Sequence, residues 1–370
     1  MTHASVSLEQ RARGALMGAY VGDALALGPH WYYDLDALRR DYGDWITDYT
    51  EPRPGRYHAG LRAGQSSQAG HILDLLVHSL TERGGYDEPD FCRRLDEQLF
   101  PRLDGTPMNG PGGYTSQSIR ETWRLRVGER RPWGEVAGLA DTTEAAERVL
   151  ALAIRYAAQP AELARTVSAN TALTQRDTTV MAMTVAYACV LGSLVRGEAL
   201  DAGTSDRLMA LVRDGALPFH SVTSDGEQTP PDGPEAPRHA GQFPSPDALL
   251  TVSGILRAVA DPGVRIEPAW KASLVYGMPC AVYHQFPAAY YLAGRFQGDF
   301  ESAVLHAVNG GGQNQARAIL TGALAGAIGG IQSIPDRFLE GLEHGGERLA
   351  LAERLARQAA GDAPSAPAGN

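Results

Sequence analysis

The sequence predicts an all-α protein, and three observations support this fold class. Apolar residues recur about every three to four positions through most of the chain, the period of an amphipathic helix. The alternation of apolar and polar residues that marks β-strands is scarce. Residues suited to helix starts, such as Pro160 and Asp177, precede several apolar segments. We therefore expect packed helices without a sheet.

Composition limits the number of domains and the kinds of partner. A chain of 370 residues that is 44% hydrophobic can bury a large core, and we expect one domain over residues 1–360. The net charge of −10, without long Lys/Arg runs, argues against nucleic acid or an anionic membrane surface as a partner. Three widely spaced cysteines are typical of a reduced protein. With no apolar run of membrane-spanning length and no apolar N-terminal signal segment, we expect a cytoplasmic protein.

Two glycine-rich segments near opposite ends of the chain are the strongest structural signals. The first predicted helix, residues 8–27, carries glycines four positions apart: Gly14, Gly18 and Gly22. The apolar helix predicted within residues 307–335 has the same spacing at Gly322, Gly326 and Gly330. Residues four apart share one face of a helix, so each series forms a face without side chains. The two faces could pack against each other, or each simply allows tight packing against another helix.

The remaining elements follow from periodicity and composition. Further helices are predicted at 69–83, 87–100, 115–126, 142–158, 160–171, 178–196, 247–260, 269–277, 281–294, 299–309 and 335–359. Residues 47–70 and 101–115 are predicted loops. Residues 218–246 are rich in Pro, Gly, Asp and Ser, which predicts a flexible surface insertion, with a lid as one role for it. Residues 361–370 are predicted to be a disordered tail.

Polar and aromatic residues cluster beside the two glycine segments. Asp23 lies among apolar residues, where a carboxylate is costly to bury unless it is hydrogen-bonded or acts on a ligand. The aromatic run His30-Trp31-Tyr32-Tyr33-Asp34 predicts either a pocket wall that stacks on a planar group or a plug in the core. Gly310–Gly312 should let the backbone turn and come close to a ligand, and they precede a polar triplet at a helix start, an arrangement that suits a ligand site.

Individual residues can be assigned candidate roles. The candidates for proton transfer at neutral pH are Asp23, His30, Asp34 and His71. Asp23 with Asp34 would supply the two carboxyl groups that a metal-independent glycosidase needs. Arg317 could hold a phosphate or carboxylate, with a purely structural role as the alternative. The full set of candidate ligand-binding residues is Trp31, Tyr33, Gln65, Gln68, Tyr114, Asn309, Gln313, Asn314, Gln315 and Arg317.

The sequences GALMGAYVGDAL at residues 14–25 and AVNGGGQNQARAILTGALAGAIGGIQSIP at residues 307–335 resemble the ADP-ribosylglycohydrolase superfamily. The resemblance extends over nearly the whole chain and implies a compact multi-helix bundle with a central cleft. It also implies a small-molecule partner such as ADP-ribose or a nucleoside-like compound. The aromatic run at residues 30–34 is similar to the J1-crystallin branch of that superfamily.

The resemblance includes a departure at the metal site. Active relatives bind two magnesium ions between a Thr-Asp-Asp-Thr motif and a Gly-Gly-Asp-x-Asp-Thr motif, because magnesium prefers anionic oxygen ligands. Here the first motif corresponds to Ser67-Gln68-Ala69-Gly70. In the second motif both aspartates are replaced by glutamines, Gln313 and Gln315. We therefore expect no tight magnesium pair and no other cofactor, with a polar pocket retained.

Three functions are consistent with these residues. The first is an ADP-ribosylglycohydrolase-like hydrolase for a ribosyl, nucleotide or related polar substrate, working without the two metals. The second is a non-catalytic ligand-binding or structural protein, which the crystallin resemblance suggests. The third is an enzyme of small-molecule metabolism, a lyase or amide hydrolase, in which His30 acts as the base and Asp34 orients it.

Overall fold

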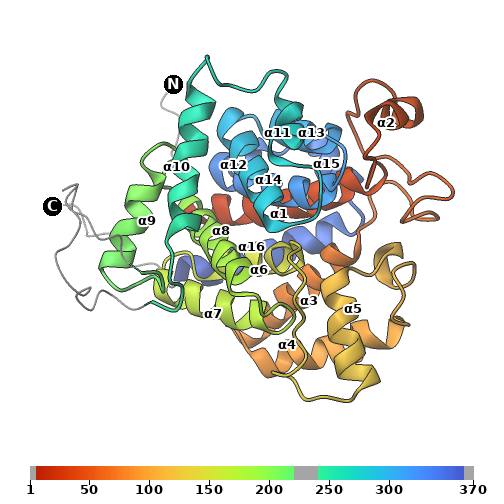
Figure 1. Ribbon diagram of the computed structural model, residues 1–370, viewed down its shortest axis with the longest axis horizontal. Helices are drawn as coiled ribbons and strands as arrows, with labels where there is room; N and C mark the ends of the chain where they lie inside the picture. The colour runs from red at the N-terminus through yellow and green to blue at the C-terminus, as the bar shows by residue number, and fades with distance from the viewer. Residues whose placement is uncertain (1–5, 221–240, 362–370) are drawn as a thin grey trace.

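The computed structural model describes residues 6–220 and 241–361 and consists of helices joined by loops (Figure 1). Within those two ranges there are sixteen α-helices and no β-strand, with strand-like pairing limited to four isolated bridges. The all-α fold class predicted from the sequence is confirmed.

The helices follow one another closely along the chain. Their bounds are α1 (Leu8–Leu27), α2 (Leu35–Tyr42), α3 (Gln68–Arg83), α4 (Glu88–Arg94), α5 (Gln117–Trp123), α6 (Glu144–Arg155), α7 (Pro160–Ala172), α8 (Thr178–Arg196), α9 (Thr204–Arg213), α10 (Asp247–Ala260), α11 (Ala272–Tyr276), α12 (Val282–Arg295), α13 (Phe300–Asn309), α14 (Asn314–Gly329), α15 (Asp336–Gly341) and α16 (Gly345–Gly361). Short 3-10 or π segments lie at Leu95–Leu99, Phe100–Arg102, Pro111–Gly113, Arg124–Gly128, Ala269–Lys271 and Ile331–Ser333.

The predicted helices are present, with three corrections. The sequence analysis missed α2, which buries only Leu38 and so has a weak apolar pattern. It also missed α9. The single helix predicted over 335–359 is two helices, α15 and α16. The chain turns between them at His344, which has a positive φ of 57°, and a Cβ on the following Gly345 would lie 2.5 Å from the Leu339 carbonyl oxygen.

Helix α1 runs through the middle of the molecule and packs against α14 (Figure 1). A Cβ on Gly14 would lie 2.2 Å from the carbonyl oxygen of Gly326, and one on Gly18 would lie 2.2 Å from that of Gly322. As the residue number rises along α1 it falls along α14, so the two helices are antiparallel. The predicted packing of the two glycine faces against each other is confirmed, and the backbones touch because no side chain separates them.

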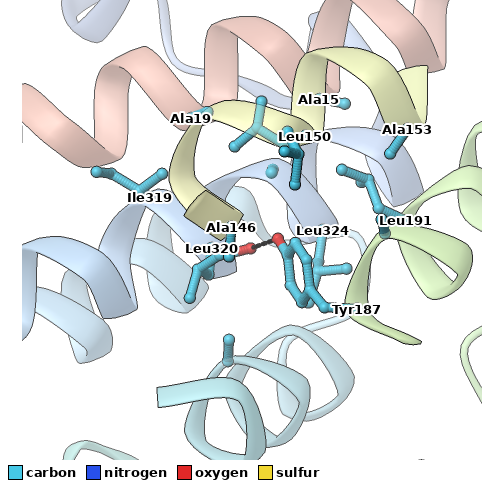
Figure 2. Close-up of a cluster of buried hydrophobic side chains, with 14 of the residues drawn as sticks. Ala15, Ala19, Ala146, Leu150, Ala153, Tyr187, Leu191, Ile319, Leu320 and Leu324 are labelled. Atoms are coloured by element: carbon cyan, nitrogen blue, oxygen red, sulfur yellow. Dashed lines mark hydrogen bonds between the residues drawn. The ribbon is translucent and has the colours of Figure 1, made fainter. Parts of the chain in front are cut away.

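The core next to this helix pair is built from small and branched side chains of four helices. Figure 2 shows residues of α1 and α14 facing residues of α6 and α8, with Tyr187 among them. The Tyr187 hydroxyl donates a hydrogen bond of 2.8 Å to the carbonyl oxygen of Leu320, which satisfies a phenol that is otherwise fully buried. α1, α6, α8 and α14 thus pack together as one unit behind the pocket described below.

Helix α8 departs from one expectation. It is the one helix of the described residues that is long and apolar enough to cross a membrane, whereas the sequence analysis found no such run. Yet 78% of its most apolar window is buried inside the fold, and it contacts α1, α6, α7 and α14. Its apolar character is explained by its place in the core.

The predicted insertion at 218–246 is attached to the core at both ends. Phe219 and Phe243 are buried, with ring centroids 5.0 Å apart, and Phe243 N–H donates to Pro218 O at 2.9 Å. Residues 221–240, which make up most of that insertion, and residues 362–370 of the predicted tail lie outside the described residues. The flexible character of both segments stays a prediction.

Candidate active site

A pocket opens where the starts of α3, α6 and α14 meet the loop that follows α1. Its empty volume, including the open mouth, is about 680 Å³. The residues that line it are His30, Trp31, His58, Ser67, Gln68, Ala69, Ile72, Tyr114, Ser116, Gln117, Arg120, Thr142, Glu144, Glu147, Cys280, Gln313 and Gln315. Six of the sequence-predicted site residues are in this set: His30, Trp31, Gln68, Tyr114, Gln313 and Gln315.

The glycine loop before α14 holds the aromatic segment in place. Gly311 and Gly312 have positive φ values of 63° and 61°, which favour glycine. Gly312 N–H donates to Tyr32 O at 2.8 Å, and Trp31 N–H donates to Gly312 O at 3.1 Å. A Cβ on Gly312 would lie 2.6 Å from the Cβ of Met278. The close approach that the glycines allow is therefore to other segments of the protein, whereas the sequence analysis expected it toward a ligand.

Arg317 lies behind this loop and holds it. Its side chain is fully buried and donates to the carbonyl oxygens of Ala307 at 3.1 Å and Gly311 at 2.5 Å. Burial lowers the pKa of the guanidinium to about 9. With its donors engaged by these backbone carbonyls and by the Gln285 side chain, Arg317 is placed for the structural role that the sequence left open, and it does not line the pocket.

The aromatic wall is formed by Trp31 and Tyr114. Trp31 has a φ of 61°, an uncommon conformation for a large residue. Its ring stacks on the His30 ring with centroids 4.0 Å apart, and the Tyr114 ring meets it edge-on at 4.3 Å. A strained residue in a pocket is a common feature of functional sites.

Two buried histidines form a hydrogen-bonded chain in the wall of the pocket. His30 Nδ1 lies 2.6 Å from His58 Nε2, and His58 Nδ1 lies 2.5 Å from the Gly112 carbonyl oxygen. On the other side, His30 Nε2 lies 2.5 Å from Gln313 Oε1. Burial lowers the pKa of His58 to about 4 and that of His30 well below its ordinary value. The sequence analysis missed His58, which stands alone in a loop with no local pattern around it.

Asp23 lies beneath the pocket and joins α3 to α14. Its carboxylate accepts from Ser67 N–H at 3.0 Å, from the Ser67 hydroxyl at 2.5 Å and from the Gln315 amide at 3.0 Å. Burial raises the pKa of Asp23 to about 6, although the bonds from Ser67 favour the charged form. The sequence left two explanations for this carboxylate, hydrogen bonding within the protein or action on a ligand. The structure shows the hydrogen bonding.

We expect Asp23→Asn to change how stability depends on pH. The folded protein binds the Asp23 proton up to pH about 6 and the unfolded chain only up to about 3.8, so the folded state is favoured at acid pH and loses stability as pH rises between those values. The loss is about 3 kcal/mol for this group. In urea unfolding at pH 4 and pH 7, the wild type should lose more stability over this interval than the Asp23→Asn variant. Equal losses in both proteins would contradict the assignment.

The pocket is also lined by two carboxyl groups that the sequence analysis did not single out. Glu144 and Glu147 lie one turn apart at the start of α6, on the same face. Threonine hydroxyls donate to both, with Thr143 Oγ1 at 2.6 Å from Glu147 Oε1 and Thr142 bonded to Glu144. Burial and then the neighbouring Glu144 raise the pKa of Glu147 to about 8, and burial also raises the pKa of Glu144.

The local sequence explains why this pair was missed. Acidic residues in the first turn, next to threonines, are what an ordinary helix start contains. Such residues usually face water, whereas Glu147 is 5% exposed. The turn is held inward by the buried Gln175, which accepts from Ala145 N–H at 2.9 Å and donates to Thr142 O at 2.7 Å. Only this distant partner shows that the two glutamates face a cavity.

Several predicted site residues lie elsewhere. Asp34 caps α2 at the surface, and hydrogen bonds from the backbone of Ala37 and Asp36 lower the pKa of its carboxyl. His71 and Gln65 lie outside the pocket, with Gln65 donating to Glu343 at 2.8 Å. Asn309 bonds the backbone of Ile46 through both ends of its amide, at 2.8 and 2.9 Å.

Two more predicted residues contact the pocket wall from outside. Asn314 is fully buried and donates to the carbonyl oxygens of Pro29 at 3.1 Å and Val308 at 3.2 Å. Tyr33 is half exposed and lies next to Cys280, which does line the pocket. Burial raises the pKa of the Cys280 thiol to about 11, so it is not poised as a thiolate nucleophile.

Comparison with known proteins assigns this fold to a family. The model of the family described as ADP-ribosylglycohydrolase matches residues 4–364. The chain belongs to the ADP-ribosylglycohydrolase family. An uncharacterized protein of Archaeoglobus fulgidus is 24% identical over 336 residues, which span 91% of this chain and 92% of that protein. A solved structure described as an ADP-ribosylglycohydrolase-related protein complex shares the fold, with a TM-score of 0.59, 19% identity, and coverage of 95% of this chain and 99% of that one.

The residues of this ADP-ribosylglycohydrolase family member do not fit the two magnesium ions that the resemblance implies. At the positions of the two motifs the donors are neutral, and Gln313 and Gln315 already bond His30 and Asp23. A Cβ on Gly70, where the first motif ends in threonine, would lie 2.4 Å from Asp23 Oδ2. Across residues 6–220 and 241–361, three or more His, Cys, Asp or Glu side chains nowhere gather as a metal site. We therefore derive no step through magnesium.

Proposed function

We propose that this chain is a glycoside hydrolase that cleaves a ribosyl, nucleotide or related small polar substrate without metal, using Glu144 and Glu147. The observation that carries the proposal is a pair of carboxyl groups with raised pKa values in the pocket, Glu147 buried and Glu144 partly exposed. Two carboxyl groups that titrate differently are the usual equipment of such enzymes. The proposal rests on this pair in place of Asp23 and Asp34, because Asp34 is at the surface.

The proposed chemistry assigns one role to each carboxyl. Glu147, protonated at pH 7, donates its proton to the leaving atom as the bond between that atom and the ribosyl anomeric carbon breaks. The Glu144 carboxylate stabilises the positive charge that develops on the sugar and takes a proton from the water whose oxygen bonds that carbon. The net reaction adds one water molecule across the bond.

The pocket also supplies neutral recognition groups. Gln68 and Gln315 present amides, and the buried Ser116 hydroxyl, which lines the pocket, has no hydrogen-bond partner within residues 6–220 and 241–361. Trp31 and Tyr114 offer rings for stacking, and Arg120 offers a cation. These groups suit a polyhydroxylated ligand with a planar and an anionic part.

The aromatic run at residues 30–34 supports a place in the J1-crystallin branch.

The proposal is tested by incubating the full chain in water enriched in ¹⁸O. The probes are ADP-ribose linked to arginine or serine peptides, free ADP-ribose, and adenosine and its 5′-phosphate. Hydrolysis at the anomeric carbon places one ¹⁸O in the released sugar, which mass spectrometry detects. If no probe is cleaved and none binds in calorimetry, the proposal is overturned.

We expect activity to survive chelation. Because the donor set lacks the charged ligands that magnesium needs, treatment with EDTA should change the rate by less than about twofold, far less than the hundredfold or larger loss expected when a group that contributes to catalysis is removed. Adding magnesium back provides the matched control. A large loss that magnesium restores would show that the neutral donors do hold the ion.

A binding protein without turnover is the second candidate. The replacement of both aspartates by Gln313 and Gln315 favours it, since amides recognise a ligand without activating water. Binding of a probe in calorimetry with no ¹⁸O in any product would establish this alternative.

A further inference from the structure

The histidine chain in the pocket wall determines what Gln313 can offer to a ligand. His58, His30 and Gln313 are 2%, 3% and 7% exposed, so water does not complete their hydrogen bonds. The chain begins at the Gly112 carbonyl oxygen and ends at the Gln313 side chain, which lines the pocket. Which atom donates and which accepts at each hydrogen bond of this chain follows from the number of protons that each group carries.

A carbonyl oxygen only accepts, so the proton between Gly112 and His58 must be on His58 Nδ1. In a neutral His58 ring, Nε2 is then a bare acceptor, and His30 must donate to it from Nδ1. In a neutral His30 ring, Nε2 is in turn bare and needs a donor. The Gln313 amide can meet this need only through its NH₂ group, with its carbonyl oxygen turned to the pocket.

The structure has the opposite orientation, with Gln313 Oε1 facing His30 Nε2, which a turn of the amide group by about 180° exchanges for the first. This orientation requires an extra proton. If Gln313 Oε1 accepts from His30 Nε2, both outer nitrogens and one inner nitrogen of the histidine pair carry protons. Four nitrogens with three protons make one of the two rings an imidazolium. The amide nitrogen of Gln313 would then face the pocket.

Burial decides between the two states at neutral pH. Within residues 6–220 and 241–361 no carboxylate is hydrogen-bonded to either ring, and burial lowers the pKa of both histidines. The charged or titratable groups that share the pocket are Glu144, Glu147, Arg120, Tyr114 and Cys280. Glu147 with its raised pKa supplies little negative charge at pH 7, the Glu144 carboxylate is bonded to Thr142 and to neither ring, and Arg120 repels a second cation. The neutral state is favoured.

The geometry points to His58 as a positioning residue that keeps the His30 proton on Nδ1 and thereby turns the Gln313 carbonyl oxygen toward a hydrogen-bond donor on the ligand. The donor is a hydroxyl or N–H group, such as those of a sugar or a carboxamide. This inference deepens the proposed function, on which its ligand class rests, but the orientation itself does not depend on any reaction.

The test is nuclear magnetic resonance of the full chain labelled with ¹⁵N at histidine and glutamine. At pH 7 we expect both rings to be neutral with the proton on Nδ1, and one NH₂ proton of Gln313 to be protected from exchange with water. A proton on His30 Nε2, or an imidazolium signal from either ring at pH 7, overturns the inference. Neither result bears on whether a substrate is cleaved, so this test and the ¹⁸O experiment fail independently.

Two variants sharpen the test. In His58→Phe, His30 loses its acceptor and should move its proton to Nε2, with loss of the Gln313 protection. In Gln313→Glu, the carboxylate only accepts, so the pair should gain a proton and show an imidazolium signal at pH 7. Gln117→Glu adds the same charge at the exposed rim of the pocket and should leave both rings neutral. Unchanged histidine signals in folded Gln313→Glu contradict the inference, as does an imidazolium in the Gln117→Glu control.

Discussion

Gly18→Ala is expected to destabilise the protein by about 3 kcal/mol or more, because the atoms that the new methyl group meets are backbone atoms that cannot move aside. The added Cβ would lie 2.2 Å from the carbonyl oxygen of Gly322 and 2.8 Å from its carbonyl carbon. Both atoms belong to the backbone of α14, so relief requires the two central helices to separate along their whole contact. Chemical denaturation followed by circular dichroism measures the loss.

A glycine on another helix provides the matched control. Gly254 lies in α10, and a Cβ there would meet nothing within 4 Å. Gly254→Ala should therefore leave stability unchanged or raise it by up to about 1 kcal/mol, since alanine is the better helix former. If Gly18→Ala and Gly254→Ala behave alike, close backbone contact is not what the glycine face provides.

Glu147→Gln is expected to lower the hydrolytic rate constant by about 10²- to 10⁴-fold, the usual contribution of a general acid. Glutamine has the size of the protonated acid but cannot release a proton. The wild-type rate should fall as pH rises through about 8, where Glu147 loses its proton. The variant should lack this limb of the pH profile. Its stability at pH 7 should not fall, because the buried side chain is already neutral there.

Glu162→Gln is the control for a glutamate in the first turn of a helix. Glu162 lies at the start of α7, pairs with Arg165 at 2.5 Å and does not line the pocket. Its replacement should leave the rate within about twofold of the wild type and the pH profile unchanged, because it contributes no proton to the reaction. Full activity of Glu147→Gln, measured on whichever probe is cleaved, would remove Glu147 from the mechanism.

Features that depend on neighbours along the chain were predictable from the sequence. The apolar period predicts the helices, and the four-residue glycine spacing predicts the bare faces of α1 and α14. The polar amides Gln313 and Gln315 could be placed at a pocket because they follow a glycine turn. α2 could not be predicted in this way, since it buries a single residue and so lacks an apolar pattern.

The roles of the acidic side chains were decided only by the tertiary structure. Asp34 and Glu147 both stand at helix starts, and nothing local separates them. Asp34 caps a surface helix, while Glu147 is buried because Gln175, 28 positions along the chain, holds its turn against the pocket. Burial sets the pKa of a carboxyl group, and burial is a property of the packed molecule. The sequence by itself determined that this protein is a helical bundle with a polar pocket, and packing determined which residues face it and in which protonation state.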